Sequence, residues 1–351
     1  MSRFELASDG GTTPDSPART RPAERGELRV GVVQTRWHPD PDEHRAALAE
    51  GTAVAAADGA ELICHQELTL SPYFALLPDG PAALDVEPET LPGGPTHTFA
   101  TGLADEHGVV VHASLYEAPG WNTAIAVAPG GDLLARTRKV HIPVTAGYHE
   151  DRYFTPGDTG YPVVRVGPAH VGFPTCWDEW FSEPARIYSL AGADLLVYPT
   201  AIGSEPDHPA FDTAPLLRQV VIGNGIANGL AMVVANRYGT ERLGDVAVTF
   251  YGSSFISDCY GRVLAAAPQD RDCVLVASID LDARRDWLEL FPFLTTRRPD
   301  TYDALVAPTD DRTDDATGAA GDLSDGPRTT GTDRPTGGRP SGAGGTGSGG
   351  A

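Results

Sequence analysis

The chain has 351 residues, of which 41% are hydrophobic, and a formal net charge of −22 at pH 7. This acidity argues against a nucleic-acid surface, and the lack of a signal peptide or of an apolar run of about 18 residues argues against a membrane protein. Four cysteines without a CxxC pair indicate neither a zinc site nor a disulfide framework, so we expect a protein of the reducing cytoplasm.

The two ends of the chain are poor in large hydrophobic residues. Residues 1–27 mix Ser, Thr, Pro, Gly and Arg without periodicity, and residues 310–351 are rich in Gly, Ser, Thr and Asp. Neither segment can bury enough apolar surface to offset the entropy that is lost on ordering. We therefore predict a disordered tail at each end and one folded domain over residues 28–309.

Inside that domain, hydrophobic strands alternate with helical patterns. The first half predicts strands at 28–34, 61–66, 109–117, 122–128 and 132–139, with helices at 42–57 and 98–107. The second half predicts β-α-β units over 163–200 and 212–236, and then strands at 249–258, 262–267 and 274–280. Strands in α/β order followed by hairpins indicate an α/β fold, in which two sheets pack face to face and helices cover them.

Three polar residues stand where predicted strands end: Glu67, Lys139 and Cys176. Cys176 comes after the apolar stretch 163–173, which predicts a buried strand, and before a helix with Ser182 as its expected N-cap. Functional groups of α/β sheets gather at strand ends, and the N–H groups of a helix start lower the pKa of a thiol. A cysteine nucleophile also needs a base and a group that stabilises the oxyanion, which a carboxylate and an ammonium group can supply. Taken singly, a free cysteine is more often a core residue.

Further segments surround these residues in a recognisable order. Together with Glu67, Lys139 and Cys176 they resemble the nitrilase (carbon–nitrogen hydrolase) superfamily over residues 28–305, nearly the whole folded body. The matching segments are 138–143 (RKVHIP), 147–158, 176–181 (CWDEWF), 192–206, 235–239 (ANRYG), 250–255 and 291–302. Several separate motifs in the same order make the resemblance specific.

The resemblance implies a four-layer αββα sandwich and a site that uses no histidine. Glu67 would be the general base, and Lys139 would stabilise the oxyanion together with the backbone N–H of Trp177. Glu150 matches the family's second glutamate, which orients the lysine and the substrate. Catalysis would pass through a covalent thiol intermediate without a metal or another cofactor, and members of the family usually form homo-oligomers.

Within the superfamily, the chain most resembles the N-carbamoylputrescine amidohydrolases of polyamine biosynthesis. These enzymes cleave a terminal ureido group to an amine, ammonia and carbon dioxide, so a small ureido or amide substrate is implied. Acidic side chains would suit the ammonium group of such a substrate, and Glu205, Asp207 and Asp178 are the candidates. The substrate-binding residues that the resemblance implies are Tyr73, Trp177, Asp178, Thr200, Glu205 and Asn224.

The chain departs from those relatives at positions that help to line their substrate pocket, where Leu217 and Asn224 replace the usual Trp and His. Two other functions therefore stay open. The first is an amidase for an N-carbamoyl amino acid, such as N-carbamoyl-β-alanine, or for an aliphatic amide, and the second is a non-catalytic binding protein. A carboxylate substrate would need a cationic clamp, for which Arg237 and Arg186 are the candidates.

Overall fold

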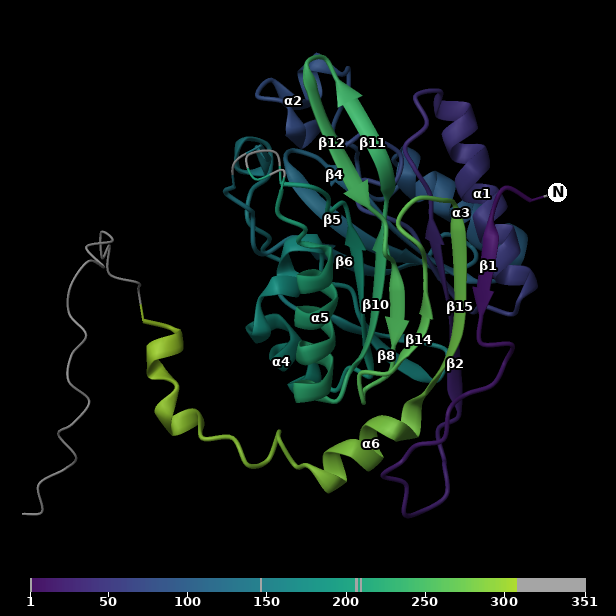
Figure 1. Ribbon diagram of the computed structural model, residues 1–351, viewed down its shortest axis with the longest axis vertical. Coiled ribbons are helices and arrows are strands. Elements are labelled where there is room, and N and C mark those ends of the chain that lie inside the picture. The colour runs from purple at the N-terminus through teal and green to yellow at the C-terminus, as the bar shows by residue number, and fades with distance from the viewer. Residues whose placement is uncertain (1, 146, 206–207, 209, 308–351) are drawn as a thin grey trace, which may run out of the picture. The chain divides into compact units, whose positions relative to one another are not determined.

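The computed structural model describes residues 2–145, 147–205, 208 and 210–307 (Figure 1). The chain divides into two compact units, residues 1–297 and 298–351. In the second unit the described residues form two short 3₁₀ turns, Pro299–Thr301 and Asp303–Leu305. The predicted C-terminal tail, 310–351, lies outside the described residues. The first unit contains the sheets and every predicted site residue.

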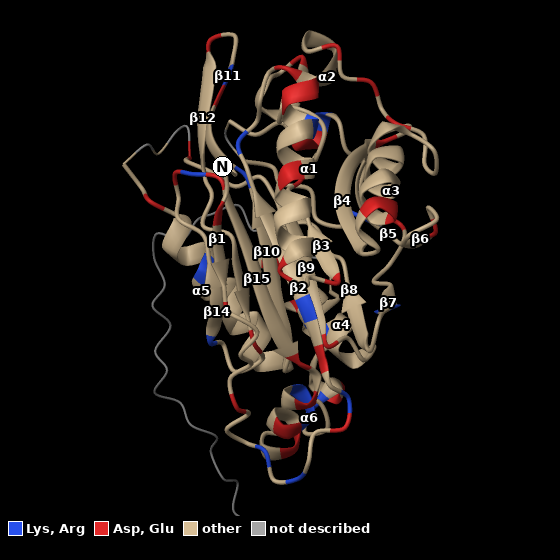
Figure 2. Cartoon of the chain, turned by 90° about the vertical axis from the view of Figure 1, so that its right-hand side faces the viewer, with Lys and Arg blue, Asp and Glu red and all other residues tan. Residues whose placement is uncertain are grey.

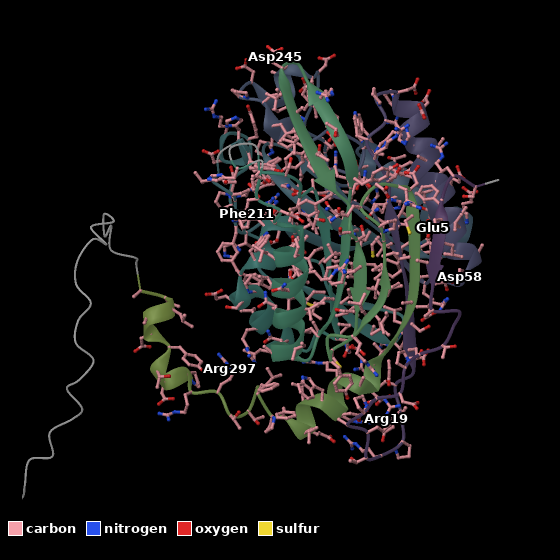
Figure 3. All side chains as sticks on the ribbon, viewed as in Figure 1. Glu5, Arg19, Asp58, Phe211, Asp245 and Arg297 are labelled. Carbon is pink, nitrogen blue, oxygen red and sulfur yellow. The ribbon has the colours of Figure 1, made fainter. Side chains whose placement is uncertain are left out.

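Two large sheets and a two-stranded ribbon are present in the described part of the chain. The seven-stranded sheet has the order β1 (Glu5–Ser8), β15 (Cys273–Asp280), β2 (Glu27–Gln34), β3 (Leu62–Cys64), β4 (Val110–Glu117), β5 (Trp121–Val127) and β6 (Leu133–Arg138). The six-stranded sheet has the order β14 (Val263–Ala266), β13 (Phe255–Ser257), β10 (Ala231–Asn236), β9 (Leu195–Thr200), β8 (Ala169–Gly172) and β7 (Val163–Val166). The ribbon pairs β11 (Tyr238–Leu243) with β12 (Val246–Tyr251), and Asp245 lies at its turn (Figure 3).

The two sheets pack face to face around the main core, to which Val32 of β2 and Val197 of β9 contribute fully buried side chains. The next residue of β2, Val33, points away from that core, because side chains alternate along a strand. Helices therefore cover both outer faces: α1 and α3 cover the first sheet, and α4 and α5 cover the second. The helices are α1 (Pro41–Ala57), α2 (Gly80–Ala83), α3 (Pro95–His107), α4 (Ser182–Leu190), α5 (Ala214–Asn228) and α6 (Leu281–Leu290). The αββα sandwich is confirmed.

The acidity of the chain lies partly on the exposed faces of the outer helices (Figure 2). Asp42 on α1 is fully exposed, and Asp105 and Glu106 on α3 are also exposed. Such a surface keeps a protein soluble and says little about its substrate. Among the helices that the structure describes, none combines the length and the hydropathy needed to cross a bilayer.

The N-terminal segment contradicts the prediction of a disordered tail over residues 1–27. Strand β1 pairs in parallel with β15 and lies beside it in Figure 1, and Phe4 is buried in the cluster beneath α1. The guanidinium of Arg25 donates to both carboxylate oxygens of Asp194, at 2.6 and 2.7 Å. The free edge of β15 and acids of the folded body thus supply partners that the composition of the segment does not reveal.

Two predicted strands are each divided in the structure. The apolar stretch 163–173 forms a hairpin of β7 and β8, because Gly167 adopts a positive φ of 55° and reverses the chain. The predicted strand 249–258 is shared between β12 of the ribbon and β13 of the six-stranded sheet. Both errors arise because hydrophobicity marks burial and not the point at which a chain turns.

Two histidines beside the main core, His65 and His112, are fully buried. His65 follows β3 and donates or accepts through Nε2 at 3.1 Å from Thr52 Oγ1, and the His112 ring stacks on Phe173. Burial lowers the pKa of His65 from 6.5 to about 4 and that of His112 from 6.5 to about 3. Both side chains are therefore neutral in the folded protein at neutral pH.

We predict that the protein loses stability as the pH falls from 6.5 to about 4. In this window the unfolded chain binds protons at His65 and His112 and the folded chain does not, so each histidine lowers the free energy of unfolding by about 1.4 kcal/mol per pH unit. Urea denaturation over that range measures the effect. His112→Phe retains the aromatic stack on Phe173 and should reduce the dependence of the unfolding free energy on pH by the contribution of one histidine. An unchanged pH dependence would contradict the assignment.

Candidate active site

The four predicted catalytic residues come from segments that follow three strands, because Lys139 and Glu150 both lie between β6 and β7. Glu67 lies shortly after β3, and Lys139 comes directly after β6 in the same sheet. Cys176 follows β8 of the other sheet and begins the 3₁₀ turn Cys176–Trp180, whereas Glu150 begins the 3₁₀ turn Glu150–Arg152. The two sheets thus deliver an acid, an amine and a thiol to one place, as the strand-end argument predicts.

Lys139 is the centre of this group. Its ammonium nitrogen lies 3.0 Å from Glu67 Oε1 and 2.9 and 2.6 Å from the two carboxylate oxygens of Glu150. All three side chains are almost completely buried. Burial by itself would lower the pKa of Lys139, but the two carboxylates outweigh that effect and raise the pKa. The two carboxylates therefore favour the charged form of the lysine.

The two oxygens of Glu67 have different surroundings. Oε1 accepts hydrogen bonds from Lys139 Nζ and, at 2.7 Å, from the side-chain amide of Asn122. Oε2 is buried and has no hydrogen-bond partner within the described residues. A carboxylate held through one oxygen with the other one free has the arrangement that a general base needs.

Glu150 is held on two sides, because the hydroxyl of Tyr73 donates to the oxygen that also contacts Lys139. Burial raises the pKa of Glu150, and the negative charge of Glu67 raises it further, while Lys139 and Tyr73 limit the rise. The nearby carboxylate of Glu67 disfavours the charged form of Glu150, whereas the ammonium group of Lys139 favours it.

Cys176 does not have the lowered pKa that the helix-start argument predicts. Burial raises the pKa of its thiol well above the ordinary value, the negative charge of Glu67 adds to this, and Lys139 opposes it. The element that Cys176 begins is a five-residue 3₁₀ turn, and α4 begins only at Ser182, with Phe181 in the N-cap position. The thiol is thus neutral at rest and must lose its proton to a neighbouring base before it can attack.

The thiol lines a cavity of about 370 Å³. Its walls are mostly apolar or aromatic, and its polar groups include Glu150, Glu205 and His208. Phe211, labelled in Figure 3, is one of the lining residues and is 56% exposed. Among the described residues, the lining consists of Tyr73, Pro143, Thr145, Tyr148, Glu150, Cys176, Trp177, Ala201, Ile202, Glu205, His208, Phe211 and Thr213. The cavity is of the size that a small organic substrate occupies.

Three of the six predicted substrate-binding residues line this cavity: Tyr73, Trp177 and Glu205. Asp178, Thr200 and Asn224 are not among its described lining residues, so the cavity gives no support to their predicted role. The Thr200 hydroxyl donates to the backbone of β10 at 3.3 Å. Asp207 lies outside the described residues.

Asp178 and Asn224 instead support the turn that carries the thiol. Asp178 accepts hydrogen bonds from the backbone N–H and hydroxyl of Thr175, at 3.2 and 3.0 Å, and its other oxygen lies 2.7 Å from His141 Nδ1. The amide of Asn224 donates to the backbone oxygen of Glu179 at 3.1 Å. Leu217, expected near the substrate, is buried among the side chains between α4, α5 and the sheet.

Residues that sequence reasoning missed also contact the site. Asn122, which binds Glu67, stands as a polar residue at the start of the apolar strand 122–128, and this contrast is the signal that could have identified it.

In the described part of the chain, no cluster of three or more His, Cys, Asp or Glu residues is arranged to hold a metal ion. The chemistry at hand is that of a thiol, a carboxylate and an ammonium group.

The chain is similar to known proteins over most of its length. Residues 29–289 match the family model described as carbon-nitrogen hydrolase. The chain is 36% identical over 282 residues to a citrullinase of Francisella tularensis, covering 80% of this chain and 98% of the relative. It is 37% identical over 292 residues to an N-carbamoylputrescine amidase of Solanum lycopersicum, covering 81% and 97%. A crystal structure of a carbon-nitrogen hydrolase from Helicobacter pylori G27 superposes with a TM-score of 0.73 at 30% identity, covering 80% and 99%.

We predict that Lys139→Met destabilises the protein by about 3–5 kcal/mol, because it leaves two buried carboxylates without their cation. Urea denaturation measures the free energy of unfolding. Adding Glu150→Gln to this variant removes one of the two charges and should restore part of the loss. A Lys139→Met variant as stable as the parent, or a double variant less stable than the single one, would contradict the charge assignment.

Proposed function

The chain belongs to the carbon-nitrogen hydrolase family, and we propose that it hydrolyses the terminal ureido group of an N-carbamoyl amine, with N-carbamoylputrescine as the expected substrate. One observation carries the choice of substrate. The cavity beside Cys176 has Glu205 among its lining residues and no Lys or Arg in the part of the chain that is described. A carboxylate at that position suits the ammonium group at the far end of such a molecule.

In the proposed first step, the sulfur of Cys176 attacks the ureido carbon while Glu67 Oε2 takes the thiol proton. The carbonyl oxygen becomes an oxyanion, which Lys139 stabilises together with the backbone N–H of Trp177. The C–N bond to the terminal nitrogen then breaks, and Glu67 returns the proton so that ammonia leaves. A carbamoyl group remains bound to the sulfur.

In the second step, Glu67 takes a proton from a water molecule that attacks the thioester-like carbon. The C–S bond breaks, the thiol regains its proton, and the released carbamic acid separates into an amine and carbon dioxide. One ureido compound and one water thus give one amine, one ammonia and one carbon dioxide. Glu150 holds Lys139 in place through both steps.

Substrates that carry only a carboxylate at the far end fit the cavity less well. The arginines considered as a cationic clamp contribute no lining residue. Arg237 binds the backbone of Glu67, and Arg186 donates to the backbone oxygen of Ala227 at 3.0 Å. The amidase for N-carbamoyl-β-alanine is therefore the weaker candidate.

A second candidate is a ureido compound that ends in an α-amino acid, as in citrulline. The relative named citrullinase, at 36% identity, favours it. His208 lines the cavity together with Glu205, so the His208 ring could donate a hydrogen bond to the carboxylate of such a substrate while Glu205 accepts one from its ammonium group. The two candidates share the same ureido chemistry at Cys176.

We predict that ammonia release is faster with N-carbamoylputrescine than with N-carbamoyl-β-alanine or a simple aliphatic amide. Citrulline belongs in the same panel, and Cys176→Ala serves as the control because it removes the nucleophile. If the protein hydrolyses none of the ureido compounds, the substrate proposal is wrong. If Cys176→Ala retains activity, the proposed mechanism is wrong.

We predict that Glu205→Gln raises KM for N-carbamoylputrescine by about 10-fold, because one charge-assisted hydrogen bond to the ammonium group is lost. The variant should change KM for a simple aliphatic amide by less than about 2-fold, since that substrate has no charge to bind. Steady-state kinetics on both substrates measure the difference. Glu183→Gln, at an exposed acid on α4, is the matched control, and an equal rise for both substrates would refute the role.

A further inference from the structure

Arg237 is a fully buried cation that lies outside the substrate cavity. It stands between β10 and β11, and its Nη2 donates to the backbone oxygens of Glu67 and Leu68 at 2.5 and 3.2 Å. The same nitrogen lies 3.4 Å from the backbone oxygen of Ser71. One guanidinium thus binds three backbone carbonyl groups of the loop that begins with Glu67.

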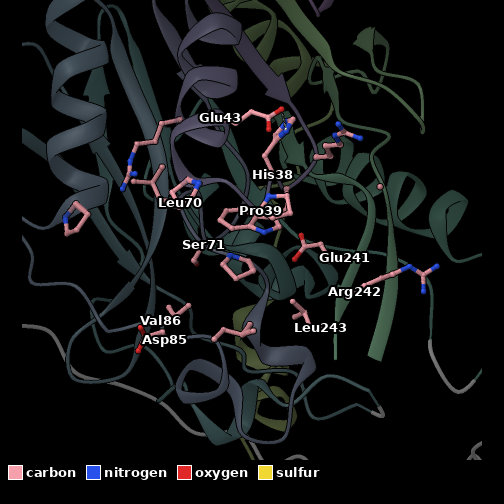
Figure 4. Close-up of a pocket in the computed structure, with 18 of the residues that line it drawn as sticks. His38, Pro39, Glu43, Leu70, Ser71, Asp85, Val86, Glu241, Arg242 and Leu243 are labelled. Carbon is pink, nitrogen blue, oxygen red and sulfur yellow. Dashed lines mark ion pairs between the residues drawn. The ribbon is translucent and has the colours of Figure 1, made fainter. Parts of the chain in front are cut away.

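Glu241 on β11 completes this arrangement. One of its oxygens accepts from Arg237 Nη1 at 2.5 Å, and the other accepts from the backbone N–H of Tyr73 at 2.9 Å. Glu241 is 5% exposed and forms part of the wall of a separate pocket of about 960 Å³, to which Ser71 also contributes (Figure 4). The ion pair of Arg237 and Glu241 therefore binds both ends of the loop 67–73.

The conformation of that loop requires such support. Leu68 has a positive φ of 47°, which is a strained backbone conformation for a residue with a branched side chain. The backbone oxygens of Glu67 and Leu68 both point at the guanidinium of Arg237. Their partial negative charges would repel each other, and the positive charge of Arg237 offsets this repulsion. Without Arg237, we expect the loop to relax to a less strained conformation, and Glu67 would move with the loop.

Both ends of the loop carry groups of the active site. Glu67 contributes its free Oε2, and the hydroxyl of Tyr73 donates to Glu150, which holds Lys139. A shift of the loop would therefore disturb the base and the ammonium group together. Displacements of about 1 Å at a catalytic group can lower a rate by about 100-fold.

We propose that Arg237 and Glu241 are positioning residues that hold the carboxylate of Glu67 where it can take the proton of Cys176. The inference rests on the base role of Glu67 in the proposed function. Neither residue touches the cavity, so they act through the loop and not on the substrate. This distinguishes Arg237 from the substrate clamp that the sequence suggested.

The test uses alkylation of Cys176 by iodoacetamide in the full-length protein, since this reaction needs loss of the thiol proton but not the natural substrate. Glu67→Gln should slow alkylation at about pH 7 by at least about 10-fold, because the base is lost. Arg237→Lys retains the charge but cannot reach all these acceptors, and should slow alkylation by about 10- to 100-fold. In the double variant Arg237→Lys/Glu67→Gln, the two factors should not multiply.

Arg284→Lys is the matched control. Arg284 likewise donates to backbone oxygens, those of Ser189, Asn228 and Gly229 at 2.9 Å each, but beside α4 and α5 and not under the Glu67 loop. Iodoacetamide should alkylate Cys176 of the Arg284→Lys variant at a rate within about 2-fold of the parent rate. Urea denaturation of every variant separates a shifted loop from an unfolded protein. If Arg237→Lys does not fold, Glu241→Gln, which retains an acceptor for Tyr73, should show the same slowing to a smaller degree.

Three outcomes would overturn the inference. Alkylation of folded Arg237→Lys at the parent rate, while Glu67→Gln is slow, would show that the clamp does not position the base. Factors that multiply in the double variant, or an equal loss in Arg284→Lys, would show a general structural effect. Parent-rate alkylation of Glu67→Gln would instead refute the base role of Glu67 itself, and with it the proposed mechanism.

Discussion

The ammonium group of Lys139 lies almost out of reach of solvent, between the carboxylates of Glu67 and Glu150. A buried charge is tolerated only where opposite charges and hydrogen bonds replace the water it has lost. Here the two carboxylates do so, and each of them in turn needs a donor: Asn122 for Glu67 and Tyr73 for Glu150. The geometry of the whole site follows from this requirement, because moving any one of these groups leaves a buried charge without its partner in an apolar interior.

The same arrangement determines the state of the nucleophile. In apolar surroundings beside a carboxylate the thiol of Cys176 keeps its proton, and the pKa is raised by burial before any charge is considered. A resting thiol and a carboxylate with one free oxygen form a pair in which proton transfer and attack occur together. The site is thus built for a nucleophile that is activated only when it reacts, and it differs from sites in which a helix start maintains a thiolate.

Glu67, Lys139 and Cys176 could be predicted because each follows a predicted strand and because together, in their sequence context, they resemble the nitrilase superfamily. The supporting residues could not be predicted in this way. Asp178 matches a motif of relatives and Asn224 stands where they usually have His, yet both side chains face the backbone of the nucleophile turn. Arg237 was considered for a substrate carboxylate, and only its contacts with the Glu67 loop assign it elsewhere.

The sequence by itself determined the α/β architecture and the identity of the reacting groups, because side-chain hydrophobicity sets which strands are buried and residue type sets the available chemistry. Only the tertiary structure decided the order of residues 2–27, the raised pKa of Cys176, the free oxygen of Glu67 and the acidic lining beside Glu205. These properties depend on desolvation and on hydrogen bonds between segments far apart in the chain. Neighbours in space create them, and neighbours in sequence do not reveal them.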